Sequence, residues 1–302
     1  MAMSRMDLGR VGIWTGALDG VPSAEAQQAA VRLEATGIKT LWVPETIGRD
    51  PFVTATLLLS ATSTLQIATG IANIYARDAV TMANTQRSLE EAFPGRFLLG
   101  LGVSHEVLVA SIRRHSYDKP YSRMKAYLDE MDAALFIAVG PTERPPTVLA
   151  ALGPRMLGLA GERADGAHPY FVTPEHTATA REILGPEPLL APEQMVVLDT
   201  DRDRAHAIAR QAMAMYLSAP NYVNNLKRLG FTDADVAGGG SDRLVEAIVA
   251  CGDAEVALKR VQAHFDAGAD HVAVQTLRSD NAVPEAEWAE LATALAEVGP
   301  KA

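Results

Sequence analysis

Residues that can move protons follow two of the short apolar runs in this chain. His105 comes soon after the run RFLLGL, and Glu45 comes directly after TLWVP. An imidazole can give or take a proton near neutral pH, so His105 is the first candidate for acid–base chemistry and Glu45 is the second. Each also has a structural alternative. His105 can be a polar residue at a helix start, and Glu45 can pair with Arg49 or Arg77.

A phosphate-binding pattern occurs at Gly153-Pro154-Arg155-Met156, between an apolar run and a helical pattern. Glycine allows a close backbone approach, and proline begins a helix without needing its own N–H. The free N–H groups and the charge of Arg155 then suit an anion. An ordinary turn between a strand and a helix is the alternative.

Other nucleotide and metal patterns are missing. Gly100-Leu101-Gly102 begins like a dinucleotide fingerprint, but His105 occupies the place of the third glycine. The sequence contains no P-loop and no nucleophile-elbow serine. Its histidines show no tight ligand spacing, so we predict no metal site. Trp14, at the end of an apolar run, can line a planar cofactor or belong to the core.

Alternating apolar runs and helical patterns must position these residues. Strands are expected at 10–14, 40–43, 65–71, 96–101, 147–152, 166–171, 194–199 and 271–277. Helices are expected at 23–36, 51–61, 78–93, 121–139, 154–163, 174–184, 203–217, 244–251, 253–267 and 284–298. The strands are continuously apolar, which is typical of a parallel sheet buried on both faces. Eight strand-then-helix units favour an α/β fold of the (β/α)8 TIM-barrel type, with chemistry at the carboxyl ends of the strands.

The region 218–241 breaks this rhythm and is expected to be rich in loops, with a short helix at 222–229. It lies between units seven and eight, where a barrel carries insertions on its functional face. A substrate lid and a plain surface loop are the two interpretations. The whole chain, 1–302, is otherwise expected to be one barrel domain.

Charge and composition narrow the function classes. Lys plus Arg total 27 against 37 for Asp plus Glu, a formal net charge of −10, which argues against a nucleic-acid or anionic-membrane binder. No run of about 18 apolar residues occurs, and the amino-terminal residues do not resemble a signal peptide. Cys251 is the one cysteine, so no internal disulfide framework is possible. We therefore expect a cytoplasmic globular enzyme.

Taken together, four motifs resemble the luciferase-like flavin and deazaflavin oxidoreductase superfamily, and particularly its coenzyme F420-dependent branch. They are WVPE, ATGIANIYARDAVTMA, PGRFLLGLGVSH and GPRMLGLAGERADGAHPY, and they occur in order along nearly the whole chain. The actinobacterial group of that branch carries GRDPF after the second strand, as this chain does.

The resemblance implies a TIM barrel, commonly dimeric, with the cofactor at its carboxyl-terminal mouth. It places a non-proline cis peptide at Gly70-Ile71 against the central ring, with Ala72 and Asn73 continuing that motif. It also places Ser104 and His105 near the phosphate and the reactive ring, and the phosphate itself at the Gly153–Met156 turn. Glu45 and Thr46 fall where some members carry an Asp-His pair, so a sugar-phosphate dehydrogenase mechanism based on that histidine is not expected.

The resulting expectation is hydride transfer between F420 and a small organic substrate, by a homodimer that binds neither nucleic acid nor membrane. A deazaflavin moves a hydride, whereas a flavin also reacts with oxygen, and the protein supplies position and a proton. The alternatives are a reduced-FMN monooxygenase, a catalytically silent flavin-binding protein, and a barrel lyase or isomerase that uses the phosphate turn.

Overall fold

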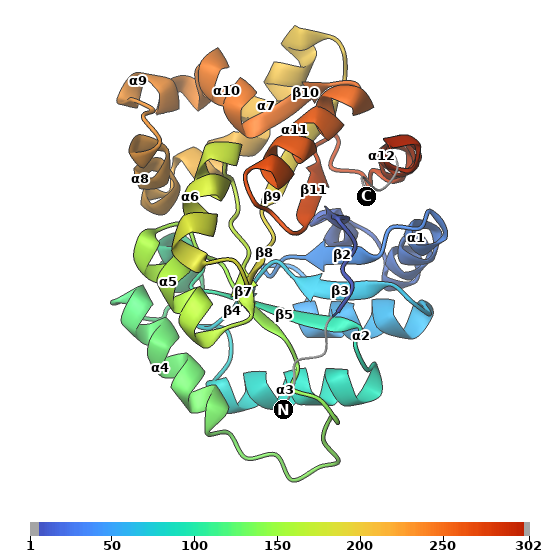
Figure 1. Ribbon diagram of the computed structural model, residues 1–302, viewed down its shortest axis with the longest axis vertical. Coiled ribbons are helices and arrows are strands. Elements are labelled where there is room, and N and C mark those ends of the chain that lie inside the picture. The colour runs from blue at the N-terminus through green and yellow to red at the C-terminus, as the bar shows by residue number, and fades with distance from the viewer. Residues whose placement is uncertain (1–5, 299–302) are drawn as a thin grey trace.

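Helices surround a curled sheet of short buried strands in the computed structural model, which describes residues 6–298 (Figure 1). The strands are β1 (Val11–Trp14), β2 (Thr40–Val43), β3 (Gln66–Thr69), β4 (Ala72–Asn73), β5 (Phe97–Gly102), β6 (Thr147–Leu149), β7 (Gly166–Ala167), β8 (Leu189–Leu190), β9 (Glu193–Leu198), β10 (Val249–Gly252) and β11 (Val272–Thr276). The helices are α1 (Ser23–Ala35), α2 (Pro51–Ala61), α3 (Ala79–Ala92), α4 (Pro120–Asp132), α5 (Pro154–Arg163), α6 (Pro174–Leu184), α7 (Arg202–Leu217), α8 (Pro220–Arg228), α9 (Asp233–Val236), α10 (Asp242–Ile248), α11 (Ala254–Asp266) and α12 (Glu285–Val298). Short 3-10 turns occupy Ala17–Gly20 and Ala237–Gly239, and a π-helical turn occupies Val107–Ile112.

Neighbouring strands pair in parallel in the order β10-β9-β11-β1-β2-β3-β5-β6-β7-β8, and β4 pairs with β5. β8 and β9 are successive parts of one segment, separated by Ala191 and Pro192. β8 pairs with β7, while β9 pairs with β11. That segment therefore links the β7 side of the sheet to the β11 side, and the curled sheet is TIM-barrel-like. The predicted α/β class with a parallel sheet is confirmed.

Aromatic side chains fill the inside of the curled sheet. Trp14 and Trp42 occupy paired positions on β1 and β2, and both are buried. They pack with small and branched residues from the other strands, including Ala68, Val148 and Ala273. A larger apolar cluster joins the outer faces of the strands to the helices. The sheet interior is therefore a packed core, and open space is left at its two ends.

One predicted helix is too long. The helix expected at 121–139 ends at Asp132, because its buried face of Met124, Tyr127, Leu128 and Met131 ends there. The Arg87 guanidinium donates to the carbonyl oxygen of Ala134 at 2.7 Å and helps to terminate the helix. Beyond it, Leu135, Ile137 and Val139 are exposed, so no packing continues the helix.

Two other boundaries also differ from the prediction. The helix expected at 244–251 ends at Ile248, and Val249–Gly252 instead pair with β9 as β10. A free strand edge and β-branched Val249 favour this pairing over another helical turn. The strand expected at 166–171 keeps only Gly166–Ala167, because Pro169 has no N–H for the ladder and Phe171 has a φ of 60°.

The short helix expected at 222–229 is confirmed as α8, but the expectation that the rest of 218–241 is rich in loops is wrong. Most of this region is helical. It contains α8, α9 and the 3-10 turn Ala237–Gly239, and it ends directly before α10. Pro220 begins α8, Thr232 and Asp235 form a capping box for α9, and Ser241 caps α10. These residues favour turns as well as helix starts, so their clustering resembled a loop. The region does lie between β9 and β11, as expected for its place in the chain.

Candidate functional site

The carboxyl ends of β1, β2, β3, β5, β6 and β7 surround a cavity of about 240 Å³. The predicted site residues that line this cavity are Trp14, Glu45, Gly70, Ile71, Ser104, His105 and Met156. The predicted residues that do not line it are Ala72, Asn73, Gly153, Pro154 and Arg155. Residues distant in sequence therefore meet at the sheet end that the fold class predicts for chemistry.

Gly70 and Ile71 form one wall of the cavity, and the peptide bond between them is cis, as predicted. The Trp14 Nε1 donates to the Gly70 carbonyl oxygen at 3.2 Å. A Cβ on Gly70 would lie 2.5 Å from Trp14 Nε1 and 3.2 Å from His168 Nε2. Glycine is therefore required here, and its missing side chain leaves an open wall. Ala72 and Asn73 lie behind this wall as the buried strand β4.

Glu45 is held by four hydrogen bonds. Its carboxylate accepts from both Arg77 Nη atoms at 2.8 and 2.9 Å, from Arg113 Nη2 at 3.2 Å, and from the Asn73 backbone N–H at 2.8 Å. The Glu45 and Arg77 side chains are only 5% and 11% exposed, so solvent screens this pair weakly. The predicted structural alternative for Glu45, pairing with Arg77, is what the structure shows. Because these donors already occupy the carboxylate oxygens, Glu45 is better suited to holding Arg77 and Arg113 in place than to accepting a proton from a substrate.

Ser104 and His105 follow β5 at the cavity edge. Ser104 has a left-handed φ of 56°, and the Tyr117 hydroxyl donates to its carbonyl oxygen at 3.1 Å. The His105 ring lies 5.3 Å from the Tyr222 ring, and its buried Nδ1 has no hydrogen-bond partner among residues 6–298. Burial lowers the pKa of His105, which keeps the imidazole neutral at neutral pH. His105 is thus a neutral, half-buried imidazole at the cavity wall.

His168 also lines the cavity, and the sequence analysis did not select it as a site residue. Its Nδ1 donates to the Ala191 carbonyl oxygen at 2.7 Å, which leaves Nε2 as an acceptor. Burial lowers the pKa of His168 to about 4, and the ring stacks on Trp42 with centroids 4.2 Å apart. Its place in the carboxyl-terminal part of the strand predicted at 166–171 was the signal that could have identified it.

A group of tyrosines closes the other side of the cavity. The Tyr170 hydroxyl donates to Gln275 Oε1 at 2.7 Å and lies 2.7 Å from the Tyr216 hydroxyl. Tyr216 comes from α7, and Asn221 and Tyr222 come from α8. Asn221 and Tyr222 belong to the region 218–241 that was considered as a lid, but none of these three was predicted as a site residue, because their contact with the cavity depends on how α7 and α8 fold back over it.

The predicted phosphate turn lies next to this cavity. Gly153 is the N-cap of α5 and supplies no capping side chain, and Pro154 occupies the first turn. The helix therefore presents free backbone N–H groups, as an anion site requires. Arg155 is exposed, with its guanidinium 4.2 Å from the centre of the Tyr121 ring.

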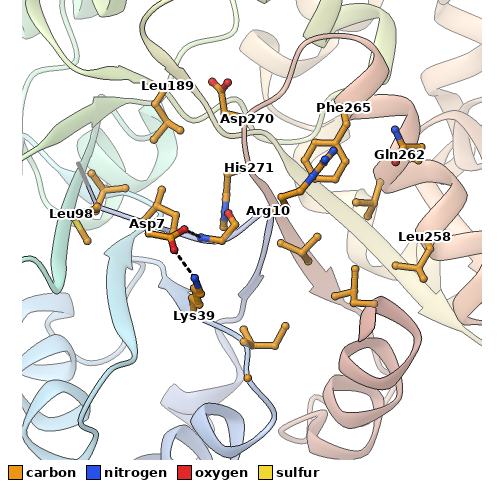
Figure 2. Close-up of a pocket in the computed structure, with 18 of the residues that line it drawn as sticks. Asp7, Arg10, Lys39, Leu98, Leu189, Leu258, Gln262, Phe265, Asp270 and His271 are labelled. Carbon is orange, nitrogen blue, oxygen red and sulfur yellow. Dashed lines mark hydrogen bonds and ion pairs between the residues drawn. The ribbon is translucent and has the colours of Figure 1, made fainter. Parts of the chain in front are cut away.

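A larger cavity, of about 940 Å³, lies at the opposite, amino-terminal end of the strands (Figure 2). Figure 2 shows Asp7 paired with Lys39, and Arg10 lying against the Phe265 ring with 4.1 Å between its guanidinium carbon and the ring centre. The charges drawn there are engaged with neighbours, and the chemistry of this fold class belongs to the other end. We therefore place the candidate site in the smaller cavity.

Comparison with known proteins shows the family of this chain. Residues 3–271 match the family described as luciferase-like monooxygenase. The chain belongs to this family. One protein similar to this chain in sequence is the 5,10-methylenetetrahydromethanopterin reductase of Methanolobus tindarius. It is 25% identical over 283 residues, which cover 79% of this chain and 86% of the relative.

Two solved structures illustrate the range of this luciferase-like fold. An F420-dependent secondary alcohol dehydrogenase in complex with an F420-acetone adduct has a TM-score of 0.76 and 16% identity, covering 96% of this chain and 98% of the other. The oxygenating constituent of 3,6-diketocamphane monooxygenase of Pseudomonas putida, in complex with FMN, has a TM-score of 0.71 and 14% identity, covering 97% and 98%. Within residues 6–298 of this luciferase-like protein, no helix is long and apolar enough to cross a membrane.

Proposed function

We propose that this protein is an F420-dependent oxidoreductase that transfers a hydride between the deazaflavin and a small organic substrate. The observation that carries the proposal is the pairing of two features at one end of the sheet. A glycine wall at Gly70 borders a cavity, and an uncapped helix amino terminus at Gly153 lies beside it. A flat ring with an anionic side chain needs both features.

The cavity fits part of such a cofactor. Its volume of about 240 Å³ is below the roughly 300–1,000 Å³ of sites that enclose a whole drug-sized ligand. It would therefore take the ring, against Gly70, Ile71 and Trp14. The ribityl phosphate and the rest of the side chain would leave along Met156 toward the Gly153 turn.

When bound, a deazaflavin supplies or accepts the hydride. The residues of this chain supply position and a proton path. His105 is the proposed proton-transfer group, since its Nδ1 has no partner among the described residues and its imidazole stays neutral. Tyr216 and Tyr222 cover the cavity and exclude water from it.

A reduced-FMN monooxygenase is the second candidate, because a solved structure of the same fold holds FMN. The two candidates differ in their reaction with oxygen, since a reduced flavin reacts with oxygen and a deazaflavin moves a hydride. Oxygen uptake in the presence of reduced FMN would therefore support the second candidate.

Calorimetric titration of the purified protein with F420 and with FMN tests the proposal. We expect F420 to bind at least about tenfold more tightly, a difference of about 1.4 kcal/mol. Equal affinities, or tighter binding of FMN, would contradict the deazaflavin assignment.

A further inference from the structure

Helix α8 reaches across the candidate site to the phosphate turn of α5. If Gly153 carried a Cβ, the nearest atom outside its own neighbours would be Nη2 of Arg228, at 3.7 Å. The last residue of α8 therefore lies over the amino terminus of α5, and Figure 1 shows these two helices on the same side of the molecule. This contact joins the 218–241 region to the cofactor side of the site.

One face of α8 carries polar groups along this path. Asn221, Asn225 and Arg228 are four and three residues apart, so they share a helix face. Asn221 lines the cavity, and Arg228 lies at Gly153. A rise of 1.5 Å per residue separates these two ends by about 10 Å. The helix thus extends from the ring cavity to the phosphate turn.

Two arginines at this turn are not neutralised. Arg228 Nη2 donates to the Asn225 amide oxygen at 3.1 Å, and Arg155 stacks on Tyr121. Neither forms an ion pair with a carboxylate in the part of the chain that the structure describes, although the chain has ten more acidic than basic residues. Two uncompensated guanidinium groups beside a helix amino terminus create a local positive potential in an acidic protein.

A buried donor without a partner lies at the same place. Asn225 is 2% exposed, and its Nδ2 has no hydrogen-bond partner within residues 6–298. Its amide oxygen holds Arg228, so its amide nitrogen lies beside the guanidinium at the turn. Asn225 Nδ2, the two guanidinium groups and the helix N–H groups are all donors, which is the composition of an anion site.

We propose that Arg155, Arg228 and Asn225 form an anion subsite for the acidic side chain of the cofactor, and that this subsite selects a deazaflavin with carboxylates beyond its phosphate. The inference rests on the proposed function and deepens it. FMN ends at a single phosphate, which the amino terminus of α5 can hold alone. F420 continues past its phosphate into glutamyl carboxylates, and these need the additional cations.

Three probes separate the parts of the ligand in a binding experiment. They are F420, its ribityl deazaflavin precursor without phosphate or glutamates, and FMN, each titrated into the folded protein by fluorescence or calorimetry. The variants are Arg228→Gln, Arg155→Gln and their double. Lys227→Gln is the matched control, because it removes the same charge from α8 while Lys227 pairs with Asp233 at 2.6 Å, away from the turn.

We expect Arg228→Gln to weaken F420 binding by about ten- to a hundredfold, the size of a lost charge-assisted hydrogen bond. The same variant should weaken FMN binding by less, and binding of the ribityl deazaflavin by less than about twofold. The Lys227→Gln control should change the affinity for none of the three by more than about twofold. Added salt should weaken F420 binding to the wild type more than to the double variant.

Several outcomes would overturn the inference. Unchanged F420 affinity in the double variant would exclude the anion subsite. An equal loss of affinity for F420 and for the ribityl deazaflavin would assign Arg228 a packing role instead. Equal wild-type affinities for F420 and the ribityl deazaflavin would refute the subsite while leaving the proposed function standing. If the wild type binds FMN but neither deazaflavin, the proposed function itself fails.

Discussion

The indole Nε1 of Trp14, at the end of β1, donates to the carbonyl oxygen of Gly70, at the end of β3, across 3.2 Å. The bond fixes the wall of the candidate site against the aromatic interior of the sheet. It also leaves no room for a side chain at position 70, because the indole and His168 both lie where a Cβ would be.

We predict that Gly70→Ala destabilises the protein by about 1–3 kcal/mol, as overpacking does. Its Cβ would lie 2.5 Å from Trp14 Nε1, and the indole cannot retreat within a packed core. Urea unfolding measures the effect. Gly158→Ala in α5 is the control, because a Cβ there meets nothing within 4 Å, and it should stabilise the helix by about 0.5–1 kcal/mol. Wild-type stability of the position-70 variant would disprove the close packing.

His105→Ala is expected to lower kcat by at least about a hundredfold, the usual contribution of a positioned acid or base. Affinity for the cofactor should change by less than about tenfold, because position 105 is expected to act in turnover. The measurement is steady-state turnover with F420 and a substrate found by screening, beside a binding titration. His105→Asn separates the alternatives, since Asn can hydrogen-bond but cannot shuttle a proton. Near-normal kcat in the Asn variant would leave His105 a purely structural role.

Glu45→Gln should lower the free energy of unfolding by about 2–3 kcal/mol, because it leaves the largely buried Arg77 with only the exposed Asp50 as a carboxylate partner. The Glu45 and Arg77 side chains are both largely buried. The exposed pair Lys259–Glu255 provides the control, and Glu255→Gln should change stability by less than about 0.5 kcal/mol. Unchanged stability in Glu45→Gln, together with a large loss of kcat, would instead make Glu45 the base.

Glu193 should make stability depend on pH. Burial raises its pKa from 4.5 to about 8, and one carboxylate oxygen accepts from the Phe171 N–H at 3.2 Å. Tyr170, Tyr216 and Tyr222 are the titratable groups that face it. The folded state holds a proton that the unfolded state releases above pH 4.5, so this contribution to stability falls as pH rises.

The expected slope is about 1.4 kcal/mol per pH unit between the two pKa values, and it levels off above the folded one. Urea unfolding from pH 5 to pH 9 measures it. Glu193→Gln keeps an acceptor for Phe171 and should remove this component, whereas exposed Glu255→Gln should leave it in place. An unchanged pH profile in Glu193→Gln would show that another group titrates.

Much of the fold was predictable because its signals are local. The buried strands appear as continuous apolar runs, such as TLWV for β2, and Asp50 and Asp78 cap α2 and α3 at the positions that their types favour. The glycine at position 70 and the Gly-Pro turn before α5 are equally visible in the sequence. The resemblance carried by these motifs also predicted the family and the cis peptide at Gly70-Ile71, and both predictions are confirmed.

Only the tertiary structure decided what each polar side chain does. Glu45 looked like a second base, but Arg77 and Arg113 occupy its carboxylate. Region 218–241 was expected to be rich in loops around one short helix, but only the structure shows that this helix, α8, brings Arg228 to Gly153. The physical reason is that helix and strand patterns are written in neighbouring residues, whereas ion pairs, tautomers and pocket walls depend on groups that meet only after the chain folds.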